Sequence, residues 1–317
     1  MKIFITGVKG QLGNDLSKEL LRRGHEVTGS DLKSGGERHK AKPRGGSEDR
    51  AEGEFTYLQL DITDEDAVRE AVVRTGPDAV IHCAAWTDVD GAEDEANREK
   101  VYAINVTGTS NVVKAAAAAG ASVMYISTDY IFDGTGTEPR KPDDRDYAPL
   151  NYYGKTKLEG ELRVTEMLER FFIVRISWVF GKAGNNFVKA IINAGRTHDV
   201  LRVVNDQIGS PTYTKHLSVL LSDMIESDRY GYYHAANEGD FISWYDFACE
   251  IVRQAGIDTE VIPVSTEEYG LRAAARPENS RLDKKKLEDE GFTPLPHWRE
   301  ALAEYMEEVQ INGADKC

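Results

Sequence analysis

The sequence predicts a doubly wound α/β fold, in which helices cover both faces of a parallel β-sheet. Short runs rich in Val, Ile and Phe alternate with longer segments in which apolar residues recur at helical spacing. Most of the short runs are apolar throughout, as is typical of parallel strands buried on both faces. The expected strands are 2–6, 26–30, 55–60, 79–83, 122–126 and 171–176, and the expected helices are 11–23, 64–74, 95–119 and 150–169.

One segment interrupts this alternation, and the pattern loosens near residue 181. Residues 33–53 are rich in glycine and charge, which predicts a mobile loop after the second strand. We expect a first domain over 1–180 and a smaller α/β substrate-binding lobe over 181–317, with one element returning to the sheet. The lobe's expected strands are 201–204 and 261–264, and its expected helices are 214–226, 243–255 and 298–309.

Charge and composition exclude several classes of protein. A formal net charge of −15 at pH 7 argues against nucleic-acid binding, which depends on Lys and Arg at phosphates. Cys83, Cys249 and Cys317 lack metal-ligand spacing, so we expect no metal site and a reducing compartment. The first strand leaves no room for a signal peptide, and no apolar run approaches about 18 residues. These features predict a cytoplasmic protein with no membrane partner.

A glycine pattern follows the first strand and opens the first helix. Gly7 allows a tight turn, Gly10 lets the backbone approach a pyrophosphate, and Gly13 lets the helix pack against the sheet. The helix N-terminus then presents free N–H groups and a positive dipole to the phosphates. The sequence therefore predicts a Rossmann-type fold that binds NAD(P).

Two acidic residues flank the expected adenosine site. Asp31 ends the second strand eighteen residues after Gly13, where an acid binds the ribose hydroxyls and favours NAD. Asp61 and Ile62 are placed to border the adenine, although Asp61 could equally cap the next helix. The choice between NADH and NADPH stays open, because cations of the 33–53 loop could bind a 2′-phosphate or only keep the loop solvated: Lys33, Arg38, His39, Lys40, Lys42 and Arg44.

Tyr153 and Lys157 form the candidate catalytic pair. A spacing of four places both on one helix face, and a neighbouring ammonium would lower the pKa of the phenol. Alone, this pair could equally be a surface tyrosine above a solvated lysine. Thr128 follows the fifth strand, at the sheet edge where such folds bind ligands, and its hydroxyl could bind the substrate oxygen.

Together these motifs resemble the extended short-chain dehydrogenase/reductases, and within them the dTDP-4-dehydrorhamnose reductase family. The resemblance runs through most of the chain, in the segments 10–13, 84–90, 127–134, 153–161, 175–181, 186–188, 206–212 and 276–283. It implies reduction by NADPH or NADH of the 4-keto group of a nucleotide-linked deoxysugar, from dTDP-4-dehydro-L-rhamnose to dTDP-L-rhamnose. The chain departs from the family pattern in its long 33–53 loop and at Trp86, where Tyr or His is expected.

The resemblance also implies residue roles. Tyr153 would donate the proton, Lys157 would orient it, Thr128 would tune it, and Asn105 would support the lysine through water. Trp178 would pack on the sugar, which Thr128, Asp129 and Gln207 would help to bind. Arg276 or Lys189 would bind the substrate diphosphate. The residues implied at the cofactor, besides the glycines and acids above, are Gln11, Leu12, Ala84, Ala85, Tyr153 and Lys157.

Other functions fit parts of the pattern. A 4-epimerase would use the same Tyr and Lys, and the regulatory β subunit of methionine adenosyltransferase resembles the same branch. A 4,6-dehydratase is disfavoured, because Asp129 is followed by Tyr130 and not by Glu. A homodimer is expected, with the helices from Glu95 and Leu150 as its face by analogy with the fold.

Overall fold

The computed structural model describes residues 1–33, 55–270 and 273–314. The predicted 33–53 loop lies outside the described residues except for Lys33, and so do the other loop cations considered above. Within the described ranges, no helix has both the length and the apolar character needed to cross a membrane.

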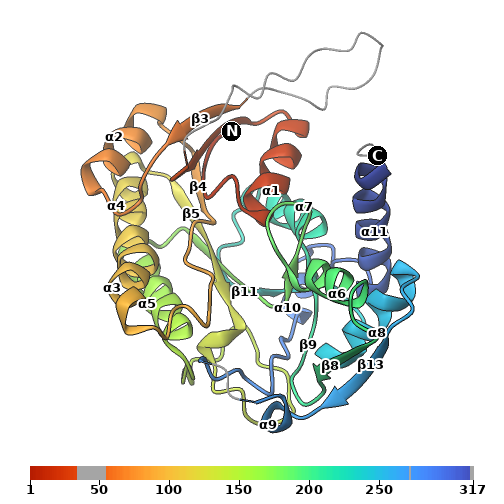
Figure 1. Cartoon of the computed structure of the whole chain (residues 1–317). Helices are drawn as coiled ribbons and strands as arrows, with labels where there is room; N and C mark the ends of the chain where they lie inside the picture. Colours follow the sequence, from red (N-terminus) through yellow and green to blue (C-terminus); the bar gives the residue numbers. More distant parts are fainter. Residues whose placement is uncertain (34–54, 271–272, 315–317) are drawn as a thin grey trace, which may run out of the picture.

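A seven-stranded sheet forms the centre of the molecule (Figure 1). The strand order is β11-β6-β5-β4-β1-β2-β3, and every pairing is parallel. The order reverses between β1 and β4, which defines the switch point where such folds bind ligands. The predicted doubly wound fold is therefore confirmed. The strands are β1 Lys2–Thr6, β2 Glu26–Asp31, β3 Thr56–Gln59, β4 Ala79–His82, β5 Ser122–Thr128, β6 Phe171–Ile176 and β11 Gly231–Ala235.

Two layers of helices cover the sheet. Helices α1 (Gln11–Arg22) and α7 (Thr214–Ile225) pack on one face, and α2 (Glu65–Thr75), α4 (Thr109–Ala119) and α5 (Tyr152–Met167) cover the other (Figure 1). Strand β5 runs two residues further than predicted, because its last residues pair with Arg175 and Ile176 of β6. This pairing carries Thr128 to the carboxyl edge of the sheet.

The predicted helix over 95–119 is helical throughout but not uniform. It consists of α3 (Glu95–Tyr102), a π-helical turn η1 (Ala103–Gly108) and α4. Such π turns inside α-helices occur frequently at functional sites. Asn105 lies in this turn and is buried.

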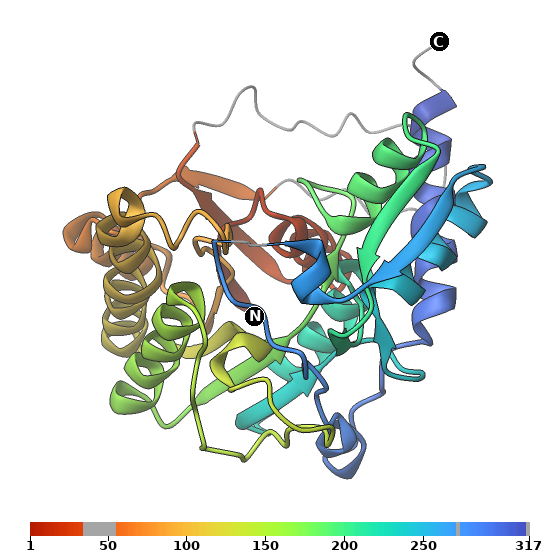
Figure 2. The same ribbon diagram turned by 60° about the horizontal axis from the view of Figure 1, so that its bottom comes forward.

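The described residues after 180 contribute to the sheet and also build a second core. Strand β11 and helix α7 join the sheet layers, while α6 (Phe187–Gly195), α8 (Trp244–Ala255) and α11 (Trp298–Ala314) share an aromatic core. Figures 1 and 2 show these helices, coloured green to dark blue, on one side of the molecule. The remaining elements are η2 Asp129–Ile131, β7 Val179–Phe180, β8 Val200–Val204, β9 Ile208–Gly209, β10 Thr212–Tyr213, β12 Ile242–Ser243, β13 Glu260–Val264, α9 Thr266–Tyr269 and α10 Lys285–Asp289. The division at residue 180 stays a prediction.

Candidate active site

A cavity of about 1190 Å³ lies along the carboxyl edge of the sheet. This volume exceeds the roughly 300–1,000 Å³ typical of a site for one small ligand. It extends from the glycine turn to the start of α5 and on to the aromatic core of residues 181–317. The predicted site residues that line it are Gly7, Gly10, Gln11, Leu12, Gly13, Asp31, Asp61, Ile62, Ala84, Ala85, Thr128, Asp129, Tyr153, Lys157, Trp178 and Arg276.

The glycine turn has the shape that a pyrophosphate requires. Gly7 has a φ of 70°, and a Cβ there would lie 2.7 Å from the backbone nitrogen of Ala84. A Cβ on Gly13 would lie 2.3 Å from the carbonyl oxygen of Gly7, so only glycine lets α1 approach the turn this closely. No side chain among the described residues caps α1. Its first N–H groups can therefore bind phosphate oxygens, and the residues present fit a dinucleotide.

At the adenosine end of the cavity, the predicted acid Asp31 lies near a cation that was not predicted, Lys9. The Asp31 carboxylate accepts hydrogen bonds from the backbone nitrogens of Lys9, at 3.1 Å, and Lys33, at 3.4 Å. The Lys9 ammonium donates to the Lys33 carbonyl at 3.1 Å and lies 4.6 Å from the centre of the Tyr57 ring. A positive charge thus stands close to the predicted ribose acid.

Asp61 was predicted either to border the adenine or to cap the next helix, and the cap of α2 tests the second role. Asp64 caps this helix by accepting a hydrogen bond from the Ala67 nitrogen at 3.0 Å. Asp61 instead accepts from the nitrogen and hydroxyl of Thr63 and lines the cavity. The capping alternative for Asp61 is therefore wrong.

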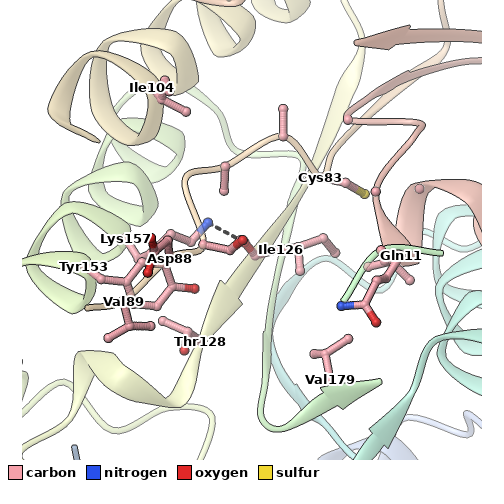
Figure 3. A pocket seen from close by; sticks show the side chains of 18 of the residues that line it. Gln11, Cys83, Asp88, Val89, Ile104, Ile126, Thr128, Tyr153, Lys157 and Val179 are labelled. Carbon is pink, nitrogen blue, oxygen red and sulfur yellow. Dashed lines mark hydrogen bonds between the residues drawn. The ribbon is translucent and has the colours of Figure 1, made fainter. Parts of the chain in front are cut away.

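The start of α5 carries Tyr153 to the end of β5. Asn151 caps the helix by accepting from the Gly154 nitrogen at 2.8 Å, and its amide donates to the Ala275 carbonyl at 2.8 Å. A Cβ on Gly154 would lie 2.2 Å from the Tyr130 carbonyl oxygen, so a glycine is required for this close approach. Figure 3 shows Tyr153, Lys157 and Thr128 directed into the same end of the cavity.

The electrostatics of the candidate catalytic pair, Tyr153 and Lys157, differ from the prediction. The Lys157 ammonium donates to the Ile126 carbonyl at 2.7 Å and lies 4.1 Å from the centre of the Tyr125 ring. Burial lowers the pKa of Lys157 to about 7, although Glu161 and Cys83 oppose this shift. Burial, and then the charge of Asp129, raise the pKa of Tyr153, against a hydrogen bond with Thr128. The prediction that Lys157 lowers the pKa of Tyr153 is wrong here, because the amine is directed at a carbonyl and is easily neutralised.

Thr128 and Asp129 form a buried polar pair beside the phenol. The Thr128 hydroxyl donates to Asp129 Oδ1 at 3.0 Å and accepts from the Tyr130 nitrogen at 3.2 Å. Burial raises the pKa of Asp129 to about 6, while hydrogen bonds from Ser280 and Thr128 lower it. The pair therefore places a hydroxyl donor and a weakly acidic carboxyl next to Tyr153.

At the far end of the cavity, Trp178 has an unusual backbone. It is the one non-glycine residue with a positive φ, 48°, among the described residues. Such a conformation costs a bulky residue about 1–3 kcal/mol and persists only where the surroundings enforce it. Its indole stacks on Trp244, with ring centres 3.8 Å apart and planes at 15°.

Comparison with known proteins agrees with this geometry. The model of the RmlD substrate binding domain family matches residues 1–311. The chain belongs to this family.

Relatives of this RmlD-family chain are similar to it over nearly their full length. The spore coat polysaccharide biosynthesis protein SpsK of Bacillus subtilis is 38% identical over 97% of both chains. A crystal structure of a dTDP-4-dehydrorhamnose reductase from Clostridium acetobutylicum superposes with a TM-score of 0.86 and 40% identity, covering 98% of this chain and 100% of that one. The dTDP-4-dehydrorhamnose reductase of Bacillus anthracis, solved in complex with NADP, gives 0.84 and 39%, covering 97% and 99%.

Three predicted residues do not line the cavity of this RmlD-family chain. The Asn105 side chain accepts from the Trp86 nitrogen at 2.8 Å and donates to the Thr156 hydroxyl at 3.0 Å, so it ties the loop after β4 to α5. Gln207 donates to the Thr266 hydroxyl. The Lys189 ammonium donates to two backbone carbonyls of its own segment. Lys189 is therefore the weaker candidate for a diphosphate ligand.

Arg276 lines the cavity but already has a partner. Its guanidinium binds both carboxylate oxygens of Asp90, at 3.0 and 2.6 Å. Lys100 also lines the cavity, and its ammonium lies 5.7 Å from the centre of the Trp86 ring. Neither Lys100 nor Trp244 was predicted, because the place of each at the cavity depends on contacts with residues distant in sequence. The described residues contain no group of three or more His, Cys, Asp or Glu side chains suited to a metal ion.

A buried ion pair lies one helical turn beyond Lys157. Glu161 of α5 accepts from the Arg175 guanidinium at 3.0 and 2.9 Å, and both side chains are almost fully buried. Arg175 also donates to the Tyr147 hydroxyl and the Pro142 carbonyl. The pair fixes α5 to β6.

Proposed function

We propose that this chain reduces the 4-keto group of dTDP-4-dehydro-L-rhamnose to give dTDP-L-rhamnose, with NADPH or NADH as the reductant. The supporting observation is one continuous cavity that has the glycine turn at one end and Tyr153, Lys157 and Thr128 further along. The homologous structures from C. acetobutylicum and B. anthracis carry the name of this reductase.

In this reaction, the protein's own residues donate a proton and align the substrate. A dinucleotide held at the glycine turn would supply the hydride that reduces the carbonyl carbon. Tyr153 donates a proton to the carbonyl oxygen, and the Thr128 hydroxyl, which donates to Asp129 in the structure, turns to donate a hydrogen bond to the same oxygen. Tyr153 is protonated at neutral pH, and its raised pKa makes it a weaker acid than a free tyrosine. Lys157, with a pKa of about 7, can take up or release a proton near Tyr153 between turnovers.

Substrate binding uses the other end of the cavity. The indole of Trp178 offers a flat apolar face to the sugar ring. Arg276 would bind the diphosphate, and because Asp90 neutralises it, we expect the phosphate to share or replace that carboxylate. The predicted roles of Asp129 in binding the sugar and of Asn105 in supporting Lys157 remain part of this proposal.

We further propose that both cofactors are accepted. Asp31 favours the ribose hydroxyls of NADH, whereas the Lys9 ammonium beside it could pair with the 2′-phosphate of NADPH. The two groups oppose one another, so a strong preference is not expected.

Turnover is the direct test. Purified protein is mixed with dTDP-4-dehydro-L-rhamnose generated in situ, and absorbance of NADPH or NADH is followed. Tyr153→Phe should lower the rate by roughly 10²- to 10⁴-fold, the range for a general acid. Tyr152→Phe is the matched control, because the Tyr152 hydroxyl points to the Arg98 carbonyl at 3.4 Å.

Other outcomes identify the competing functions. Sugar epimerisation without net cofactor consumption would identify a 4-epimerase. Dinucleotide binding without any turnover, together with co-purification of a methionine adenosyltransferase, would favour the regulatory reading. Equal losses of turnover rate in Tyr152→Phe and Tyr153→Phe would contradict the assignment of Tyr153 as the general acid.

We also propose a homodimer across α3 and α5. Tyr102, Leu150 and Leu162 on or beside these helices are more than one-third exposed, and a dimer would cover them. Light scattering on Leu162→Glu should then report a monomer, and an unchanged mass would contradict this interface. The cytoplasmic location stays a prediction.

A further inference from the structure

The segment 206–212 stands out in the sequence, yet it surrounds Trp178 rather than lining the cavity as a ligand site. The Thr212 nitrogen donates to the Trp178 carbonyl at 3.1 Å, and the Thr212 hydroxyl donates to the Ser177 carbonyl at 2.6 Å. The Ser177 hydroxyl in turn donates to the Ser210 carbonyl at 2.8 Å. These three hydrogen bonds hold the backbone on both sides of the left-handed residue.

The same segment limits where the indole can lie. A Cβ on Gly209 would be 2.9 Å from Cε2 of Trp178, closer than such atoms approach without displacement. No positive φ is recorded for Gly209, so the requirement for glycine here is one of space. The edge of the Trp178 ring therefore rests against the bare backbone of β9.

The face of the Trp178 ring is covered from the neighbouring strand. Strand β12 pairs with β9, with Ile242 opposite Gly209, and Trp244 follows β12 directly as the first residue of α8. The pairing of β9 with β12 thus places both Gly209 at the edge of the Trp178 ring and Trp244 on its face. Phe187 packs against Trp244, with ring centres 4.5 Å apart.

We propose that Trp244 and Gly209 are positioning residues that fix the Trp178 indole before the sugar nucleotide binds. With one face on Trp244 and one edge on Gly209, the indole is 9% exposed and lines the cavity with the part that stays accessible, where an apolar sugar surface would meet it. A ring fixed in advance loses less conformational entropy on binding, which strengthens affinity without a new contact to the ligand. This inference rests on the proposed function, because it assigns the sugar of that reaction to Trp178.

The test compares Trp244→Leu, Trp244→Phe and Gly209→Ala. Because stacked indoles couple electronically, the wild type should show an exciton couplet in far-UV circular dichroism that Trp244→Leu and Trp244→Phe abolish. Trp244→Leu should weaken dTDP-L-rhamnose binding by up to about tenfold in calorimetry, given the worth of an aromatic pair. Trp244→Phe should retain most of the affinity, because a flat ring still supports Trp178. Gly209→Ala should weaken both the couplet and the affinity.

The matched control is Tyr305→Leu. Tyr305 is buried in the same core, where its ring packs on Phe180 and Tyr213. It should lower the melting temperature while keeping the couplet and the affinity. In turnover, the positioning variants should raise KM and change kcat little.

Wild-type affinity in both Trp244→Leu and Gly209→Ala would overturn the proposal, as would an equal loss in Tyr305→Leu. If Trp244→Leu does not fold, Gly209→Ala and Trp244→Phe decide. If the wild type binds dTDP-L-rhamnose but fails to oxidise NADPH or NADH, only the proposed reduction is refuted. The affinities of the variants for dTDP-L-rhamnose would still test the positioning. Normal turnover with unaffected variant affinities would refute the positioning alone.

Discussion

Replacing Asp129 with asparagine should stabilise the protein, and only at neutral and higher pH. Asp129 is 4% exposed, and its pKa rises from the ordinary 3.8 to about 6 because burial disfavours its charge. A raised carboxyl pKa means that the folded state binds the proton more tightly than the unfolded chain. The associated stability is therefore fully present below about pH 4 and is lost as pH rises through about 6.

The magnitude follows from the two pKa values. Each tenfold change in proton affinity corresponds to about 1.4 kcal/mol, so the ionised carboxylate costs the folded protein roughly 3 kcal/mol above pH 6. Asparagine carries no charge and keeps an acceptor for the Thr128 hydroxyl, which donates to Oδ1. The variant should thus be about 3 kcal/mol more stable than the wild type near pH 8, and nearly equal to it near pH 4.

Urea unfolding from about pH 4 to pH 8 provides the assay. Asp133→Asn is a control of opposite sign, because hydrogen bonds with Thr135 and the charge of Arg140 lower the pKa of Asp133. That variant should be less stable than the wild type above about pH 4, and the gap should close as pH falls. The reasoning would be refuted if the difference in unfolding free energy between Asp129→Asn and the wild type did not change with pH. It would also be refuted if Asp129→Asn were less stable than the wild type near pH 8.

Three further predictions concern buried groups. Glu161→Gln leaves the Arg175 guanidinium buried without a charged partner and should cost about 3–5 kcal/mol of unfolding free energy in urea, so a loss below 1 kcal/mol would contradict a structural role. Gly13→Ala should lower stability, because its Cβ meets backbone atoms. Gly10→Ala should mainly lower dinucleotide affinity, because its Cβ meets one oxygen at 3.2 Å. Equal melting temperatures of the two variants would be the contrary result. Cys83 is half-buried and lines the cavity, and burial raises the pKa of its thiol to about 12, so mass spectrometry should find that iodoacetamide alkylates it much more slowly in the folded protein than in urea. Rapid labelling of the folded protein would contradict this environment.

Local pattern determined much of the fold and part of the site. The apolar strands and the glycine turn are set by neighbours close in sequence, so β1 and β6 have the predicted bounds and Gly13 has the predicted close contact. The spacing of Tyr153 and Lys157 likewise places both at the cavity, because one helical turn separates them. Their roles in catalysis stay predictions that the turnover experiment tests.

Only the tertiary structure decided the electrostatics and the partners. Whether a buried ammonium lowers the pKa of a phenol depends on where it points, and Lys157 points to the carbonyl of Ile126. The hydrogen bonds of Asn105 with Trp86 and Thr156, the pairing of Arg276 with Asp90 and the stacking of Trp244 on Trp178 join segments distant in sequence. No local spacing encodes such contacts, because burial and charge act through space and not along the chain.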